Sequence, residues 1–217
     1  ANNLTVLNDA GAMKYGTDAL GGVIVVTPAE LPTDQQIGGE LHLIGNSNGT
    51  AGTLSGLLEG GIKNAKGWGW RVQGTGRRSG DSRTPDYLLS NTGFREMNYS
   101  ASAGHHSETS GFEVFYSHFN TTIGILRGSA SESTQDLAMA LHRNTPAYTT
   151  NFSYTINEPR QEVMHNLVKV NGHIRSNKNL YNVQYGLQIN TRKEFDVRRG
   201  TTLTEKPALA YKLFTHT

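Results

Sequence analysis

The stretch "LYNVQYGLQIN", residues 180–190, decides the fold class of this chain. From residue 182 onward its even-numbered positions carry only Asn, Gln and Gly. Its odd-numbered positions are all apolar or aromatic: Tyr181, Val183, Tyr185, Leu187 and Ile189. This strict alternation predicts a β-strand with one apolar face and one wet face. The length matches the ~9–11 residues that a tilted strand needs to cross a bilayer, and a half-exposed strand of a soluble β-sandwich alternates in the same way.

The same alternation recurs along the chain. It is clear in three further segments: "WGWRVQGTGR" (68–77), "MNYSASAG" (97–104) and "VKVNGHIR" (168–175). Three others are less regular, being rich in Gly or aromatic on both faces: 37–48, 51–63 and 111–121. We count seven strands, with the start of an eighth in "ALAYKLFTHT" (208–217). The sequence therefore predicts an all-β fold, an antiparallel up-and-down transmembrane β-barrel portion.

Loop lengths indicate independently which strand ends lie together. Three connections are short: "KNAKG" (63–67), "HHSETSG" (105–111) and "SNKN" (176–179). Three are long: 78–93, 122–162 and 191–208. Because alternate connections of a meander lie at the same end, we expect the long loops at one end and the short turns at the other. Short periplasmic turns and long extracellular loops are typical of outer-membrane barrels.

The polar positions also favour a barrel interior. They hold mainly Asn, Gln, Ser and Gly with scattered Arg, His and Lys, which suits a wet but crowded lumen. Trp68 and Trp70 follow the tight turn "NAKG" at a strand end. Trp is favoured there at a membrane interface because its ring is apolar while its N–H needs a polar partner. Simple core packing is the alternative for this pair.

Composition and motifs exclude several classes of function. The net charge is only +2, with 20 Lys and Arg against 18 Asp and Glu, so there is no electrostatic footprint for nucleic acid. The absence of Cys removes disulfides and cysteine zinc sites. No apolar run approaches the ~18 residues of a membrane helix. There is no nucleophile elbow, P-loop or Rossmann glycine pattern, so we expect no enzyme, no cofactor and no metal.

Residues 1–29 differ in style from the rest. The segment "YGTDALGGVIVVTP" (15–28) places Gly21 and Gly22 directly before the apolar run from Val23 to Val26. The glycines would permit positive φ or a close backbone approach. Continuous apolarity predicts a strand that is buried on both faces.

This segment resembles the end of the plug domain in TonB-dependent outer-membrane receptors. In that family a Tyr-Gly pair, small residues and Gly-Gly-Val-Ile immediately precede the barrel. The positions that carry the match are Tyr15, Gly16, Thr17, Asp18, Ala19, Gly21, Gly22, Val23 and Ile24. Two positions depart mildly, Thr17 where Ser is commoner and Pro28 where Lys often follows.

A second resemblance lies downstream. "TIGILRGSASESTQDLAMAL" (122–141) and "NFSYTINEPRQEVMHNLVKVNG" (151–172) look like the third long loop and the following strand of such receptors from Bacteroidetes-type bacteria. The resemblance implies that residues 1–29 are the C-terminal end of the plug domain and 30–217 the N-terminal portion of the barrel. Because the family's barrel has about 22 strands around its plug, we expect this chain to be only part of a receptor.

The resemblance also implies location, activity and partners. It predicts a cell outer-membrane protein that contacts outer-membrane lipid and the remainder of the receptor, its plug and later strands. It implies energised uptake of a scarce extracellular solute, an iron chelate such as a siderophore complex, a cobalamin or a glycan. Contact with the TonB complex is expected only through a plug segment outside this chain. The alternatives are a small self-contained outer-membrane barrel, acting as an adhesin or structural protein, and a soluble all-β binding module.

Three groups of residues are candidates for function. The plug-end motif is expected to be structural: Tyr15, Gly16, Asp18, Gly21 and Gly22. The long loop 122–162 is expected to hold a short capped helix, with Ser133 and Asp136 as a capping box. Its aromatic residues either contact ligand or pack the loop onto the barrel rim: Tyr148, Phe152 and Tyr154. Lumenal cations either attract an anionic solute or pair with plug carboxylates: Arg71, Lys169, His173 and Arg175.

Overall fold

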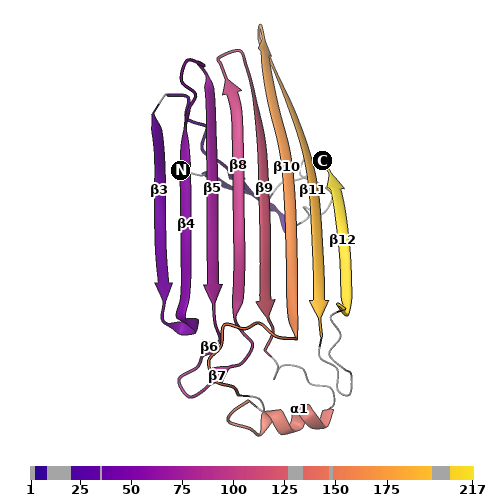
Figure 1. Cartoon of the computed structure of the whole chain (residues 1–217). Helices are drawn as coiled ribbons and strands as arrows, with labels where there is room; N and C mark the ends of the chain where they lie inside the picture. Colours follow the sequence, from indigo (N-terminus) through magenta and orange to yellow (C-terminus); the bar gives the residue numbers. More distant parts are fainter. Residues whose placement is uncertain (1–2, 9–20, 35, 127–133, 147–148, 197–205) are drawn as a thin grey trace.

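The computed structural model describes residues 3–8, 21–34, 36–126, 134–146, 149–196 and 206–217. In these ranges the dominant feature is one antiparallel sheet of eight strands, in the order β12-β11-β10-β9-β8-β5-β4-β3. Each strand pairs with the next strand of the sheet along the chain, as Figure 1 shows. The predicted all-β antiparallel class is therefore confirmed. None of the helices found in these ranges has the length and apolar character needed to span a membrane.

The eight strands lie close to where alternation predicts them: β3 (Ile37–Asn46), β4 (Ala51–Gly61), β5 (Trp68–Ser79), β8 (Phe94–His106), β9 (Ser110–Gly124), β10 (Arg160–Ser176), β11 (Asn179–Phe195) and β12 (Leu209–His216). The eighth strand is present as β12. The long loops are shorter than predicted, because β9 continues to Gly124, β10 begins at Arg160 and β11 continues to Phe195. These strand ends have ladder partners, since Arg160 pairs with both Gly124 and Phe195.

The smaller elements lie outside this sheet. They are β1 (Asn3–Leu7), β2 (Val23–Thr27), the 3-10 turn η3 (Asn48–Thr50), β6 (Ser82–Arg83), β7 (Leu88–Leu89) and α1 (Thr134–Leu141). Strands β1 and β2 form a two-stranded antiparallel sheet. The predicted burial of β2 on both faces is wrong, because Ile24 is 65% and Val26 is 56% exposed. The described residues place no second layer over this two-stranded sheet, so these side chains are open.

The register of the ladder gives the sheet two different faces. Residues that are paired across strands share a face. One row across five strands is largely apolar: Val72, Ala101, Tyr116, Val168 and Leu187. The adjacent row on the opposite face is more polar: Arg71, Ser102, Phe115, Lys169 and Gly186.

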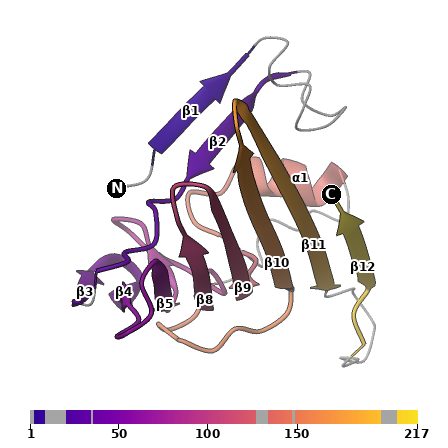
Figure 2. The ribbon, with the colours of Figure 1, turned by 90° about the horizontal axis from the view of Figure 1, so that it is seen from above.

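The sheet is curved, and the β1–β2 hairpin lies on its hollow side (Figure 2). Arg71 reaches residues just after β2, so the face that carries Arg71 is this hollow side. We call it the concave face, and the face that carries Val72 the convex face. The convex face has no layer over it in the described part of the chain: Leu41 is 75%, Leu43 82% and Val183 71% exposed. A large exposed apolar surface of this kind marks contact with another apolar phase or partner.

The sheet is open. Its outermost strands are β3 and β12, and the described residues contain no strand paired with their outer edges. Among the same residues Phe195 is the one large hydrophobic side chain classed as buried, at 6% exposure. The described residues thus form a single curved layer without a central hydrophobic core.

Candidate functional site

The long connections gather at one end of the sheet, where β6, β7 and α1 also lie (Figure 1). The short turns lie at the opposite end, as the loop lengths predict. The described parts of the long loops form a rim of buried polar residues, among them Ser79, Asp81, Ser90, Asn91, Thr121 and Thr122. Buried polar groups must be hydrogen-bonded to be tolerated. The rim is therefore the first candidate site.

Asp81 joins two of the long loops. Its side chain is 2% exposed, and its two carboxylate oxygens accept hydrogen bonds from the backbone N–H groups of Thr92 (3.1 Å) and Ser153 (3.2 Å). Its own N–H donates to the carbonyl oxygen of Ser153 (3.0 Å). Hydrogen bonds to an ionised acceptor are about twice as strong as neutral ones. Asp81 therefore fixes the loop before β10 against the loop after β5.

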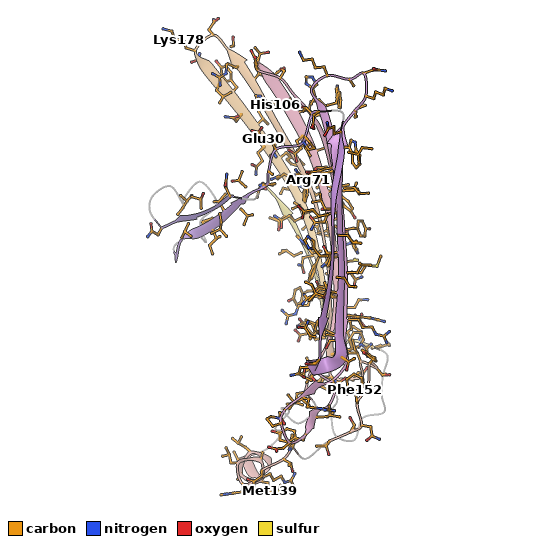
Figure 3. All side chains as sticks on the ribbon, turned by 90° about the vertical axis from the view of Figure 1, so that its left-hand side faces the viewer. Glu30, Arg71, His106, Met139, Phe152 and Lys178 are labelled. Atoms are coloured by element: carbon orange, nitrogen blue, oxygen red, sulfur yellow. The ribbon has the colours of Figure 1, made fainter. Side chains whose placement is uncertain are left out.

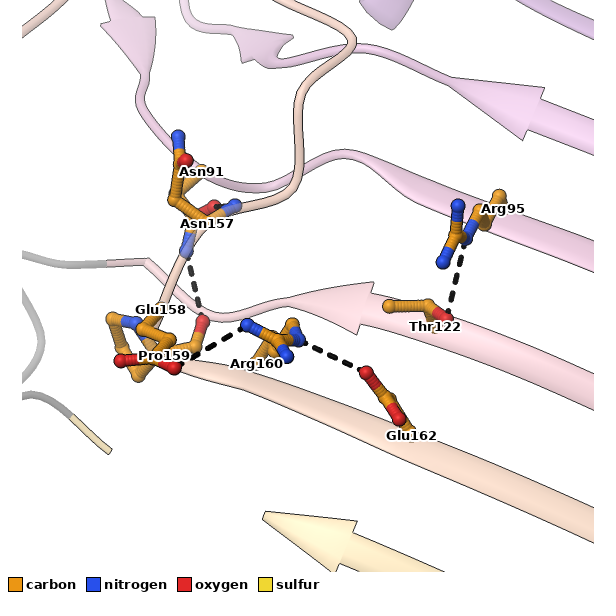
Figure 4. Close-up of polar contacts among 8 residues, drawn as sticks. All are labelled: Asn91, Arg95, Thr122, Asn157, Glu158, Pro159, Arg160 and Glu162. Atoms are coloured by element: carbon orange, nitrogen blue, oxygen red, sulfur yellow. Dashed lines mark hydrogen bonds and ion pairs between the residues drawn. The ribbon is translucent and has the colours of Figure 1, made fainter. Parts of the chain in front are cut away.

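Asn91 joins three segments through one amide. Its Nδ2 donates to the carbonyl oxygens of Ile125 (2.9 Å) and Pro159 (2.8 Å), and its Oδ1 accepts from the N–H of Asn157 (2.8 Å). Figure 4 shows this contact beside the start of β10. Its φ of 60° lies in the left-handed region, which Asn tolerates better than most residues.

Arg160 completes the rim at the first residue of β10. Its Nε donates to Glu162 (3.0 Å) and its Nη1 to Glu158 (3.4 Å), as drawn in Figure 4. Its guanidinium carbon lies 3.8 Å from the ring centroid of Phe195. The cation is thus held between two carboxylates and an aromatic face, which leaves it saturated rather than available to an anionic ligand.

A cavity of about 430 Å³ opens at this rim. It lies between the β3–β4 turn and the loop after β5, and its polar lining includes Asn48, Asp81, Arg83 and Thr84. Asn48 shapes it, since its Oδ1 accepts from the N–H of Arg83 (2.7 Å) and its Nδ2 donates to the carbonyl oxygen of Arg83 (3.1 Å). The lining of amide, hydroxyl, cation and aromatic groups can hydrogen-bond and stack a polar organic ligand.

The predicted loop aromatics have different places. Phe152 lines the cavity and is 37% exposed. Tyr154 packs the loop onto the rim, because its hydroxyl donates to the carbonyl oxygen of Thr50 (2.8 Å) and its ring lies 4.7 Å from the Arg78 guanidinium. The two rings meet edge to face, with centroids 5.1 Å apart. Tyr148 lies outside the described residues.

The predicted loop helix is present as α1. Ser133 and the side chain of Asp136 lie outside the described residues, so the capping box does too. The apolar side chains of Leu137 and Leu141 in α1 are 50% and 76% exposed.

Arg71 binds the segment that directly follows the β1–β2 hairpin. Its Nη1 and Nη2 donate to the carbonyl oxygens of Ala29 (2.9 Å) and Glu30 (3.0 Å), and its Nε donates to Glu59 (2.6 Å). Figure 3 shows Arg71 and Glu30 on the side of the sheet from which the hairpin projects. The carboxylate it pairs with belongs to β4. The segment after β2 is bound through its backbone instead.

The other predicted lumenal cations share the concave face but do not gather around Arg71. Lys169 occupies the same cross-strand row, with β8 and β9 between them. His173 lies nearer the short turns, where its ring centroid is 5.2 Å from that of His106. Arg175 is exposed, and its N–H donates to the carbonyl oxygen of Thr109 (2.7 Å). They form a dispersed polar surface.

The plug-end motif is described only in part. Tyr15, Gly16 and Asp18 lie outside the described residues. Gly22 has φ +104°, and a Cβ there would lie 2.9 Å from the carbonyl oxygen of Leu7 in β1. The position thus needs glycine both for its conformation and for the close approach of β1. Gly21 has open space around it.

A hydrogen-bonded network interrupts the convex face. The Oδ1 of Asn166 accepts from the Tyr116 hydroxyl (3.0 Å) and lies 2.8 Å from Nδ1 of His118. The His118 ring stacks on Tyr99 with centroids 4.9 Å apart. At the short-turn end, Trp68 packs on Phe112 with centroids 5.5 Å apart. The convex face therefore carries aromatic groups at two levels along the strands.

The sequence did not indicate the three side chains that bind backbone groups of other loops at the rim. Asp81, Asn91 and Asn48 stand in loops or a short turn, where Asn and Asp commonly serve local turns. The described residues hold no group of three His, Asp or Glu placed to bind a metal ion. No protein-family model, curated protein or solved structure matches the chain.

Proposed function

We propose that the chain is part of a TonB-dependent outer-membrane receptor for energised uptake of a scarce large solute, an iron chelate, a cobalamin or a glycan. Residues 1–29 are then the end of the plug and 30–217 the first strands of the barrel. No covalent chemistry is involved. Solute binds at the rim and the plug, and energy transmitted by TonB moves the plug.

The contact between Arg71 and the segment after β2 is the observation that carries this proposal. A hairpin that precedes the sheet in sequence lies on its concave polar face, and a charged side chain of β5 binds the segment that directly follows this hairpin. The opposite face is apolar and uncovered in the described residues. A wall with an apolar outside, a polar inside and a preceding segment inside it is the arrangement that a plugged barrel needs.

The rim supports the recognition part of the proposal. Asp81 and Asn91 hold the described loop segments in a fixed arrangement, and Phe152 and Asp81 line the cavity beside the β3–β4 turn. Pre-ordered loops lose little entropy when a ligand binds. A closed eight-stranded barrel has less support, because β3 and β12 lie at opposite edges of the sheet.

Side-specific labelling of the full-length protein tests this proposal. The chain has no Cys, so single cysteines can be introduced at two exposed sites: Asp86→Cys among the long loops and Lys66→Cys in a short turn. In intact cells a membrane-impermeant maleimide should label the Asp86→Cys variant. The Lys66→Cys variant should react only after the outer membrane is permeabilised. Equal labelling of both in intact cells, or recovery of the protein outside the membrane fraction, would refute the proposal.

A further inference from the structure

The convex face of β3, β4, β5 and β8 carries an apolar groove of about 920 Å³. The ladder register explains its shape. Gly56 of β4 pairs with Gly74 of β5, and this glycine pair lies between Leu41 and Tyr99 in one cross-strand row. In the next row Gly76 lies between Leu54 and Met97. The glycines form the floor and the larger side chains form the walls.

The groove is open because its floor has no side chains. A Cβ at Gly76 would meet nothing within 4 Å, and one at Gly74 would meet only the carbonyl oxygen of Asn98 at 4.0 Å. The walls are apolar and exposed, with Leu54 at 54% and Met97 at 66%. A channel of this kind fits a flexible hydrocarbon chain lying along the strands.

Two arginines stand at the long-loop end of the groove. Arg78 pairs directly with Arg95 across β5 and β8, one residue pair beyond Gly76 and Met97 on the same face. Like charges directly opposite each other destabilise a sheet. In the described part of the chain, neither guanidinium has a carboxylate within ion-pairing distance. Arg78 lies over Tyr154 (4.7 Å), and Nε of Arg95 lies 3.4 Å from the Thr122 hydroxyl (Figure 4).

The neighbouring cation shows the contrast. Arg77 precedes Arg78 in the chain but points to the concave face, where it lies 3.5 Å from Glu96. The uncompensated charge is thus specific to the groove side. An anion between Arg78 and Arg95 would convert their repulsion into a paired contact, since the planar guanidinium binds phosphate oxygens in bidentate fashion.

We propose that this groove and arginine pair bind a phosphorylated membrane lipid, with its phosphate on Arg78 and Arg95 and one acyl chain over Gly74 and Gly76. The inference rests on the proposed function, because it needs the convex face to lie in a membrane and the long loops to lie outside. The lipid then belongs to the outer leaflet.

Native mass spectrometry of the full-length protein in detergent tests the site, with diphosphoryl lipid A as the probe. The Arg78→Gln/Arg95→Gln variant should bind the probe at least about tenfold more weakly, since even one charged hydrogen bond contributes about a factor of ten or more. Arg77→Gln, on the opposite face, is the matched control and should bind like wild type. Gly76→Leu should weaken binding severalfold by filling the groove, whereas Gly172→Leu on the convex face of β10 should not.

The outcomes separate the two proposals. Dephosphorylated lipid A should bind wild type as weakly as intact lipid A binds the double arginine variant. Inorganic phosphate should not compete at millimolar concentration, because it lacks the chain that fills the groove. If the protein is in the membrane fraction but the double variant binds like wild type, the lipid site is refuted and the receptor proposal stands. If the protein is not in the membrane fraction, both are refuted.

Discussion

Arg71 and Val72 are neighbours in β5, yet their side chains lie in opposite environments. Arg71 on the concave face is 17% exposed and makes three directed hydrogen bonds to named partners. Val72 on the convex face is 42% exposed and lies beside other apolar side chains. At this position the concave face makes specific hydrogen bonds within the chain. The convex face presents an exposed side chain that makes only apolar contacts.

This difference runs across the sheet but is not uniform. The convex positions of β3 and β4 carry only Gly, Leu and Ile. The half formed by β9 and β10 interrupts that face with the Tyr116, His118 and Asn166 network. A face in contact with lipid tolerates such groups because they satisfy one another.

The largest expected effect comes from placing a charge on the convex face. The Val72→Arg substitution should lower the free energy of unfolding by about 2–4 kcal/mol, the cost of a cation near the middle of a bilayer. The Gln73→Arg control on the concave face should change it by less than about 0.5 kcal/mol. Urea unfolding of the full-length protein in phosphatidylcholine vesicles measures both. Equal losses would show that lipid does not cover the convex face.

The second prediction removes the directed contacts of the concave face. The Arg71→Met substitution keeps much of the side-chain length but deletes the donors to Ala29 and Glu30. Each charged hydrogen bond contributes roughly 1.5–3 kcal/mol at full strength and less when partly exposed. We expect amide hydrogen exchange in residues 23–32 to become about tenfold faster. The Arg77→Met control should leave that exchange unchanged. An unaltered exchange rate in both variants would mean that Arg71 does not hold the hairpin.

The smallest effect is expected in the convex network. Asn166→Leu removes the acceptor shared by Tyr116 and His118 and should cost about 1 kcal/mol of stability, a typical net hydrogen bond. Met164→Leu, two residues away on the same face, is the control and should be near neutral. Unfolding in vesicles again measures both variants. An Asn166→Leu variant that is more stable than wild type would show that these hydrogen bonds do not stabilise the fold.

Much of the fold follows from the sequence. In a half-exposed strand, apolar and polar residues alternate, so the pattern shows where the strand is and which residues share a face. The stretch 180–190 does so plainly, and β11 contains it whole. The alternation is lost at strand ends near the rim, because polar residues occupy both faces there. Arg160 lies on one face and Arg192 on the other. The beginning of β10 and the end of β11 were therefore misplaced. The exposure of β2 was also missed, since an apolar run does not reveal whether a second layer exists.

The candidate site was predictable in part. The sequence left Arg71 either an anionic solute or a plug carboxylate as its partner. In the described residues its carboxylate partner is Glu59 of β4, and its other two partners are the carbonyl oxygens of Ala29 and Glu30. Such contacts depend on backbone positions that no side-chain pattern encodes. Asp81 and Asn91 were missed for the same reason, because their partners are backbone groups up to 72 residues away. The arginine pair was missed because only the ladder register places Arg78 opposite Arg95.

The Asn91 clamp has a consequence for how the sequence of the chain can change. The amide holds the carbonyl oxygens of Ile125 and Pro159, and the N–H of Ile125 donates to Pro159 as well (2.9 Å). These contacts join the two ends of the segment 126–158. The entropy of closing a loop rises only slowly with its length, by about 0.6 kcal/mol per doubling. The part of this segment that precedes Phe152, Ser153 and Tyr154, which contact the rim, can therefore lengthen, shorten or diverge while β9 and β10 keep their register.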